Sequence, residues 1–217
     1  MRIAIAAGAA LLAVGVASAA NPHLPKKVII PAVQAKTKAI NVKLSDLPAA
    51  GWKTNPPQKD EGTPRCSYYN PDQSDLTENG DANSPQFTLG TGSFVSSNAS
   101  IFKTAAQGRT AYARVVQPKL PKCLAELFRK GSGQPQNVTI VSAAERKFPK
   151  LADRSNAYRI AADFKSGASR IHVFLDVVVM NRAKVDAVVF FAGIGSAFKD
   201  SVEQSVAAKV AARTKNV

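Results

Sequence analysis

Apolar and polar residues alternate along four stretches in the second half of the chain. The stretches run over residues 138–142, 158–164, 171–179 and 185–191. A period of two places the apolar side chains on one face of an extended strand. The intervening turns at residues 165–167 and 181–183 are too short for a crossover helix, so the strands they join must run antiparallel. The pattern therefore predicts a four-stranded antiparallel meander.

Helical spacing of apolar residues occurs before and after this meander. It begins at about Lys103, continues in a short segment at residues 123–128, and returns over residues 198–210, where Ser196 is placed to cap the helix. The chain is long enough for one hydrophobic core and too short for two. We therefore predict a single α+β domain over residues 42–217. It has a leading helix, an antiparallel sheet of four or more strands and a closing helix.

The first 19 residues have the features of a secretory signal peptide. Arg2 supplies a positive charge, residues 3–16 are almost wholly apolar, and Ala17-Ser18-Ala19 offers the small residues of a cleavage site. This apolar run is shorter than the roughly 20 residues of a membrane span. We predict cleavage after Ala19 and secretion to the cell envelope of a bacterium. Retention of the segment as a membrane anchor is the alternative.

Export changes the interpretation of the two cysteines, Cys66 and Cys123. Small exported domains form disulfides, whereas the cytosol keeps thiols reduced. A bond between these two residues would constrain the unfolded chain and contribute about 4 kcal/mol on chain-entropy grounds. We predict this disulfide. Two separate buried thiols are the alternative.

Two segments before the meander show no clear periodicity. Residues 20–41 contain prolines and lysines but no carboxylates, which predicts a mobile basic leader ahead of the domain. Residues 54–85 are rich in turn-forming residues, and Asn79-Gly80 is typical of a tight turn. So long a polar segment would need the covalent tether at Cys66 to stay ordered. The single tryptophan, Trp52, is expected to fill a gap in the core.

The chain carries 29 Lys and Arg against 15 Asp and Glu, a formal net charge of +14. Most of the positive charge follows residue 102, while residues 41–102 are slightly acidic. Export and the lack of interleaved basic and aromatic residues argue against a nucleic-acid partner. The charge favours an anionic envelope polymer, a lipid headgroup or a small acidic ligand. A basic surface without any ligand is the alternative, and the sequence does not indicate an oligomeric state.

Motifs for catalysis, cofactors and metals are absent from the sequence. His172 is the only histidine in the predicted domain, and no G-x-S-x-G elbow, phosphate loop or metal-ligand spacing occurs. Asp163, Asp176 and Asp186 lie on three predicted strands and could converge as the paired carboxylates of a hydrolase. We favour a non-enzymatic domain without a cofactor. An exported hydrolase and a purely structural or assembly role are the alternatives.

One polar cluster on the predicted sheet is the candidate ligand surface. If Ser166-Gly167 forms a two-residue turn, Asp163 lies directly opposite Arg170. Arg159 and His172 then share that face of the sheet. We therefore predict that Arg159, Arg170 and His172 bind the ligand. In the alternative interpretation, each aspartate is paired with a neighbouring arginine or lies at an exposed edge.

Several short motifs resemble those of secreted proteins of high-GC Gram-positive bacteria. They are Leu47-Pro48-Ala49-Ala50-Gly51-Trp52, Cys66, Asp75-Leu76-Thr77 with Gly80-Asp81-Ala82, Ser84-Pro85-Gln86-Phe87 and Cys123-Leu124. Over residues 42–212 the layout is similar to extracytoplasmic sensor domains of receptor kinases and to exported lipoproteins with a PsbP-like α/β sandwich. The resemblance implies a ligand-binding or interaction module without catalysis. The chain differs in its single cysteine pair, where the kinase sensors have two disulfides, and in lacking a lipobox and a kinase domain.

Overall fold

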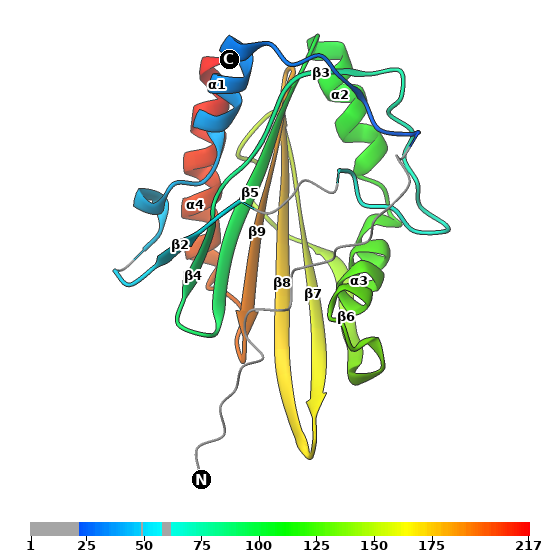
Figure 1. The fold of residues 1–217 in the computed structure, drawn as a ribbon, viewed down its shortest axis with the longest axis vertical. Helices are drawn as coiled ribbons and strands as arrows, with labels where there is room; N and C mark the ends of the chain where they lie inside the picture. Colours follow the sequence, from blue (N-terminus) through cyan, green and yellow to red (C-terminus); the bar gives the residue numbers. More distant parts are fainter. Residues whose placement is uncertain (1–21, 49, 58–61) are drawn as a thin grey trace.

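The computed structural model describes residues 22–48, 50–57 and 62–217, so the predicted signal peptide lies outside the described residues. Within these ranges nine strands form one sheet in the order β1-β3-β5-β9-β8-β7-β6, and β4 joins β5 to β2. Every strand pair is antiparallel except β1 with β3. Helices α1 and α4 cover one face of the sheet, and α2 and α3 cover the other (Figure 1). The predicted α+β class is confirmed.

The bounds of the elements define the numbering used below. The strands are β1 (Lys26–Lys27), β2 (Lys53–Asn55), β3 (Thr77–Asn83), β4 (Gln86–Leu89), β5 (Ser93–Phe102), β6 (Val138–Arg146), β7 (Arg154–Ser166), β8 (Ser169–Arg182) and β9 (Val185–Ile194). The helices are α1 (Pro31–Ile40), α2 (Ala105–Val115), α3 (Leu120–Gly131) and α4 (Asp200–Arg213). Short 3-10 turns are η2 (Leu44–Asp46), η3 (Pro135–Asn137) and η4 (Thr214–Asn216).

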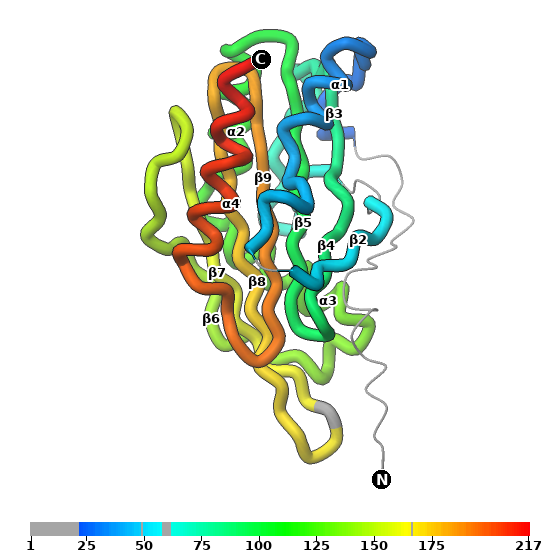
Figure 2. The backbone as a smooth tube through the Cα atoms, turned by 90° about the vertical axis from the view of Figure 1, so that its left-hand side faces the viewer, coloured from blue at the N-terminus to red at the C-terminus, as the bar shows by residue number. Residues whose placement is uncertain are grey.

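Strands β6 to β9 confirm the predicted meander, but the register of its longest hairpin differs. Ser166 pairs with Ser169, so the turn is Gly167-Ala168 and not Ser166-Gly167. Gly167 has a φ of 61°, a left-handed conformation that this hairpin turn requires and that glycine adopts without steric cost. Asp163 therefore lies opposite His172 and not opposite Arg170. The tip of this hairpin projects beyond the rest of the sheet (Figure 2).

The sheet separates two hydrophobic clusters. One cluster joins Ile40 of α1 and Val206 of α4 to Phe191 in β9. The other joins Leu124 of α3 to Tyr158 in β7, and it includes the buried half of the disulfide. Both faces of the central strands are therefore covered, as their apolar residues on both faces require. No helix in the described part of the chain is long and apolar enough to cross a membrane.

The segment that precedes α4 differs from the prediction. The helix begins at Asp200 with Lys199 at its N-cap, so Ser196 does not cap it. Phe198 lies in this linker, and its ring centroid is 5.5 Å from that of Phe191 and 6.4 Å from that of Trp52. These aromatic contacts hold the linker across the sheet before the helix starts. Trp52 packs beside the core and closes it at this point.

Residues 26–41 belong to the folded domain and are not a mobile leader. β1 pairs with β3, and Ile40 at the end of α1 is 1% exposed. Gly80 lies at a bulge inside β3, where a Cβ atom would come within 2.2 Å of Thr37 Oγ1 on α1. Asn79-Gly80 is therefore not a hairpin turn. The glycine lies within a strand, where the lack of a side chain allows α1 to pack closely against β3. The helix buries only Thr37 and Ile40, which is too few residues to give a recognisable periodicity.

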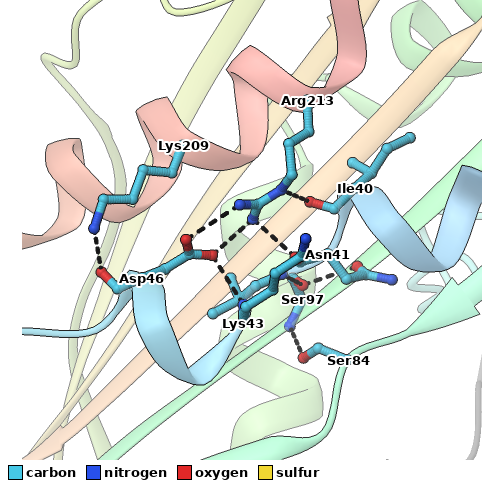
Figure 3. Close-up of polar contacts among 9 residues, drawn as sticks. Ile40, Asn41, Lys43, Asp46, Ser84, Ser97, Lys209 and Arg213 are labelled. Atoms are coloured by element: carbon cyan, nitrogen blue, oxygen red, sulfur yellow. Dashed lines mark hydrogen bonds and ion pairs between the residues drawn. The ribbon is translucent and has the colours of Figure 1, made fainter. Parts of the chain in front are cut away.

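A polar cluster joins the end of α1 to α4 (Figure 3). The Arg213 guanidinium donates hydrogen bonds to both carboxylate oxygens of Asp46, at 3.1 and 2.7 Å. It also donates to the backbone carbonyls of Ile40 and Asn41, at 2.9 and 2.8 Å. Burial raises the pKa of Asp46, but the hydrogen bonds from Arg213 and the Lys43 amide outweigh it and lower that pKa. This bidentate contact ties the N-terminal segment to the last helix.

The turn-rich segment of residues 54–85 is partly built into the sheet. β2 pairs with β4, and β3 pairs with both β1 and β5. The segment continues into a hairpin of β4 and β5, with Gly90 at a φ of 58° in the turn. Backbone pairing therefore orders much of a segment that we expected the disulfide alone to hold.

Candidate ligand-binding site

Cys66 and Cys123 form a disulfide, as predicted, with 5.7 Å between their Cα atoms. Cys66 and Tyr69 exchange backbone hydrogen bonds of 2.7 and 3.0 Å, which close a tight turn. The Tyr69 hydroxyl donates to the carbonyl of Val115 at the end of α2, at 2.6 Å. The disulfide and this hydrogen bond hold residues 66–75 against both α2 and α3.

A hollow of about 610 Å³, which we call the tyrosine hollow, lies between this segment and the junction of α2 and α3. It is lined by Tyr68, Tyr69, Asn70, Pro71, Asp72, Ser74, Asp75, Arg114, Gln117, Pro118 and Lys119. The Arg114 guanidinium crosses it and donates to both carboxylate oxygens of Asp75 and to the backbone carbonyl of Asp72. The hollow thus combines aromatic walls with a cation that is already paired.

The two carboxylates of the tyrosine hollow are held in their ionised form. Hydrogen bonds from the Ser74 amide and hydroxyl lower the pKa of Asp72 to about 2, and His23 adds to the shift. The hydrogen bond from Arg114 lowers the pKa of Asp75. Because these acids are already satisfied by partners within the chain, they add little attraction for a cationic ligand.

A second hollow of about 570 Å³ runs along the outer side of α2, and we call it the arginine hollow. It is lined by Ala106, Arg109, Thr110, Ala113, Arg114, Gln117 and Arg154. The five residues from α2 recur at intervals of three and four or lie next to one another on the same face, so they form one stripe on the helix, and Gln117 lies just beyond its end. The opposite side of the helix buries Gly108, Ala111 and Tyr112 against the sheet. Three guanidinium groups and no carboxylate therefore line this hollow.

The two hollows adjoin each other, because Arg114 and Gln117 line both. Arg154, at the start of β7, closes the far side of the arginine hollow. Its guanidinium lies 5.9 Å from the ring centroid of Tyr112 and donates to the carbonyl of Arg109 at 3.3 Å. The aromatic contact leaves most of its hydrogen-bond donors directed at solvent.

A carboxylate with a shifted pKa lies beneath α2. Burial raises the pKa of Asp186, on β9, to about 8, although Asn181 donates a hydrogen bond to it at 2.6 Å and Arg154 also acts to lower it. Glu78 nearby raises the pKa further. Asp186 is therefore protonated over much of the acidic range and does not cancel the charge of the three arginines there.

Arg159, the first predicted ligand residue, takes part in a buried ionic network beneath α4. It donates to both oxygens of Asp176, at 2.7 and 3.1 Å, and Asp176 is 0% exposed. Arg146 forms ion pairs with Glu203, which is also 0% exposed, and with Asp200 at 2.9 Å. Burial raises the pKa of Asp176 despite the hydrogen bond from Arg159. The network packs α4 on the sheet.

Arg170 and His172 lie apart from Arg159, near the tip of the β7–β8 hairpin. His172 Nδ1 is 2.6 Å from Asp163 Oδ1, and Arg170 Nη1 is 3.3 Å from the other carboxylate oxygen. The Ala161–Phe174 pair separates this group from the pair of Arg159 and Asp176. The three predicted residues thus form two groups, and neither group lines a hollow described above. Their role in ligand binding stays a prediction.

The three aspartates of the hydrolase hypothesis do not converge. Asp163 contacts His172, Asp176 contacts Arg159, and Asp186 points to the opposite face of the sheet. In residues 22–48, 50–57 and 62–217, no group of three or more His, Cys, Asp or Glu side chains could hold a metal ion.

The arginine hollow was missed in the sequence. Arg109 and Arg114 belong to a helix whose buried face contains glycine and alanine, so its polar stripe looked unremarkable. Arg154 is 40 residues further along the chain from Arg114, and only the pairing of β7 with β8 brings it beside α2. The one available signal was the absence of carboxylates from residues 103–125.

No family model and no curated protein matches the chain. Among solved structures, the extracellular domain of PknH from Mycobacterium tuberculosis is similar in part. It has 10% sequence identity and a TM-score of 0.43, with 84% of this chain and 96% of that chain covered. A likeness of this strength assigns neither a family nor a function, so the proposal below rests on the residues of this chain.

Proposed function

We propose that the chain is an extracytoplasmic, non-enzymatic domain that binds an extended anionic ligand along α2. The observation that supports this proposal is the arginine hollow, where the guanidinium groups of Arg109 and Arg154 face a solvent-accessible depression lined by no carboxylate. The third guanidinium there, that of Arg114, is paired with Asp75. Guanidinium groups bind carboxylates and phosphates through paired hydrogen bonds. Thr110 and Gln117 add neutral donors on the same helix stripe.

The length of the depression supports an oligomeric ligand. The arginine hollow adjoins the tyrosine hollow, where Tyr68 offers an aromatic surface and Lys119 a further cation. A ligand with repeated acidic groups could contact Arg109 and Arg154 at one end and Lys119 at the other. The ionised Asp72 and Asp75 also line the tyrosine hollow, so the arginine hollow would hold most of the negative charge of such a ligand.

Export is the second part of the proposal. It is supported by the Cys66–Cys123 disulfide, since such bonds persist in oxidising compartments, and by the signal-peptide features of residues 1–19. The mass of the protein recovered from an exporting host tests it. A chain beginning at Ala20 is expected. An intact Met1 terminus with two reactive thiols would contradict export.

Fluorescence anisotropy with two labelled probes tests the ligand class. Hexaglutamate carries carboxylates and linear hexaphosphate carries phosphates, so the two probes distinguish the sources of the same anionic chemistry. We expect saturable binding of at least one probe at about 0.15 M salt. The double variant Arg109→Ala/Arg154→Ala should weaken binding about tenfold or more, because it removes two charge-assisted contacts.

A matched control removes two charges elsewhere. Lys165→Ala/Arg170→Ala changes the net charge equally at the tip of the β7–β8 hairpin, and affinity should fall less than about threefold. Equal losses in both double variants would show nonspecific attraction and contradict the proposed site. A larger loss in the hairpin variant would instead favour Arg170 and His172 as the ligand residues.

A further inference from the structure

Three consecutive large apolar side chains are exposed between β1 and α1. Val28, Ile29 and Ile30 are 55%, 45% and 41% exposed. They make up three of the five exposed large apolar residues in the described ranges of the chain. Single exposed apolar side chains are ordinary in folded proteins, whereas adjacent ones mark a surface that contacts something else.

The backbone beneath these side chains is ordered. The Val28 amide donates to the carbonyl of Glu78 at 2.8 Å, and the Ile30 amide donates to the carbonyl of Asn79 at 2.9 Å. Pro31 then begins α1 directly. The exposure therefore belongs to a fixed element at the rim of the sheet, where neither face of the segment is covered by a helix.

Along its own segment, the exposed side chains around the apolar triad are basic or apolar. From residue 26 to residue 39, every exposed position is occupied by Lys, Val, Ile, Pro or Ala. Lys26, Lys36 and Lys38 are exposed among them. Lys103 lies at the same end of the molecule, because its amide donates to the carbonyl of Thr77, the pairing partner of Lys26. We call residues 26–30 with these lysines the basic–apolar patch.

This composition fits a lipid surface better than a protein partner. The core of a protein–protein interface is depleted in lysine, and its charged residues lie at the rim. At a bilayer, apolar side chains enter the boundary below the headgroups while lysines extend along their stems to the phosphates. Lys27 pairs with Asp81 at 2.5 Å, so it is not counted among the lysines that would reach the headgroups.

We propose that the basic–apolar patch docks the domain reversibly on an anionic lipid bilayer. Val28, Ile29 and Ile30 enter the interfacial region, and Lys26 and Lys103 contact the headgroups. Lys36 and Lys38, on opposite flanks of α1, add to the positive potential at this end of the molecule. The patch lies at the same end of the sheet as the start of α1, opposite the tip of the β7–β8 hairpin (Figure 1). Docking would therefore direct the hairpin away from the membrane.

Sedimentation with lipid vesicles tests this proposal. The exported protein is used, and mass spectrometry first establishes its N-terminal residue. Vesicles of equal parts phosphatidylglycerol and phosphatidylcholine are compared with pure phosphatidylcholine vesicles at about 0.15 M salt. We expect at least about tenfold stronger partitioning to the anionic vesicles. Val28→Ser/Ile29→Ser/Ile30→Ser should reduce that partitioning about tenfold or more, with no change in thermal stability.

Two matched controls address apolar exposure and charge. Leu44→Ser/Val141→Ser removes exposed apolar side chains from other surfaces and should leave partitioning within about twofold. Lys26→Gln/Lys36→Gln/Lys38→Gln should weaken it more than Lys147→Gln/Lys150→Gln/Lys165→Gln, which removes three exposed charges elsewhere. Wild-type protein that does not sediment with anionic vesicles would overturn the proposal. The proposal would also be overturned if the Val28→Ser/Ile29→Ser/Ile30→Ser variant lost self-association or binding to another protein but partitioned to anionic vesicles as the wild type does.

Discussion

The two faces of the sheet use arginine in different ways. On the α1/α4 face, Arg146, Arg159 and Arg213 are paired with carboxylates that are almost wholly buried. On the α2/α3 face, Arg109 and Arg154 line an open hollow without any carboxylate. The first group holds helices to the sheet, and the second is available to a ligand. A net charge of +14 does not distinguish these roles, because only the position of each partner does.

The largest expected effect concerns the disulfide, which only the α2/α3 face possesses. Cys66→Ala/Cys123→Ala should lower the free energy of unfolding by about 4 kcal/mol, since the unfolded chain gains the entropy of an open loop. Urea denaturation followed by circular dichroism measures this loss. The variant should also lose probe affinity, because residues 66–75 would no longer be held against α3. Unchanged affinity in a destabilised variant would separate the tyrosine hollow from the binding site.

The next effect tests the ionic network under α4. Glu203→Ala should lower the free energy of unfolding by about 3 kcal/mol, because it removes a buried carboxylate and leaves Arg146 partly unpaired. Asp200→Ala is the matched control, since Asp200 pairs with the same arginine but has a 62% exposed side chain. That control should cost less than about 1 kcal/mol. Equal losses in the two variants would contradict a buried, structural role for this network.

A pH-dependent effect is expected from Asp186, the buried acid of the α2/α3 face. Its pKa is about 8 in the folded chain and about 3.9 when unfolded, so the folded state retains a proton that the unfolded state releases. Stability should therefore fall as pH rises from about 4 to about 8, by up to about 5 kcal/mol for the full difference between the two pKa values. Asp186→Asn should flatten this dependence, which denaturation across that range would measure. A wild-type profile that rises with pH would contradict it.

Much of the fold could be predicted because its signals are local. The alternation in β6 to β9 and the helical spacing of α2, α3 and α4 depend on residues close in sequence, and each was recognised. The register of the β7–β8 hairpin was wrong by one residue in its turn, because Gly167 can occupy either position of a two-residue turn and only the pairing of Ser166 with Ser169 distinguishes the two.

The elements that escaped prediction are held by contacts distant in sequence. α1 depends on Gly80 in β3 and on Arg213 in α4 and not on a periodic face of its own. The same reason applies to the candidate site. Arg159 was correctly placed on the sheet, but the wrong hairpin register hid that Asp176 lies directly opposite it. Its second acidic neighbour, Glu203, lies in the last helix and was not visible in the sequence.

The central claim is that the arginines of the two faces have separate roles, and one pair of substitutions tests it most directly. Arg109→Ala and Arg159→Ala are compared for both the free energy of unfolding and the affinity for the anionic probes. Arg109→Ala should weaken binding severalfold and change stability by less than about 0.5 kcal/mol. Arg159→Ala should lower stability by about 2 kcal/mol and leave affinity within about twofold. Lost affinity with unchanged stability in Arg159→Ala, or unchanged affinity in Arg109→Ala, would contradict the claim.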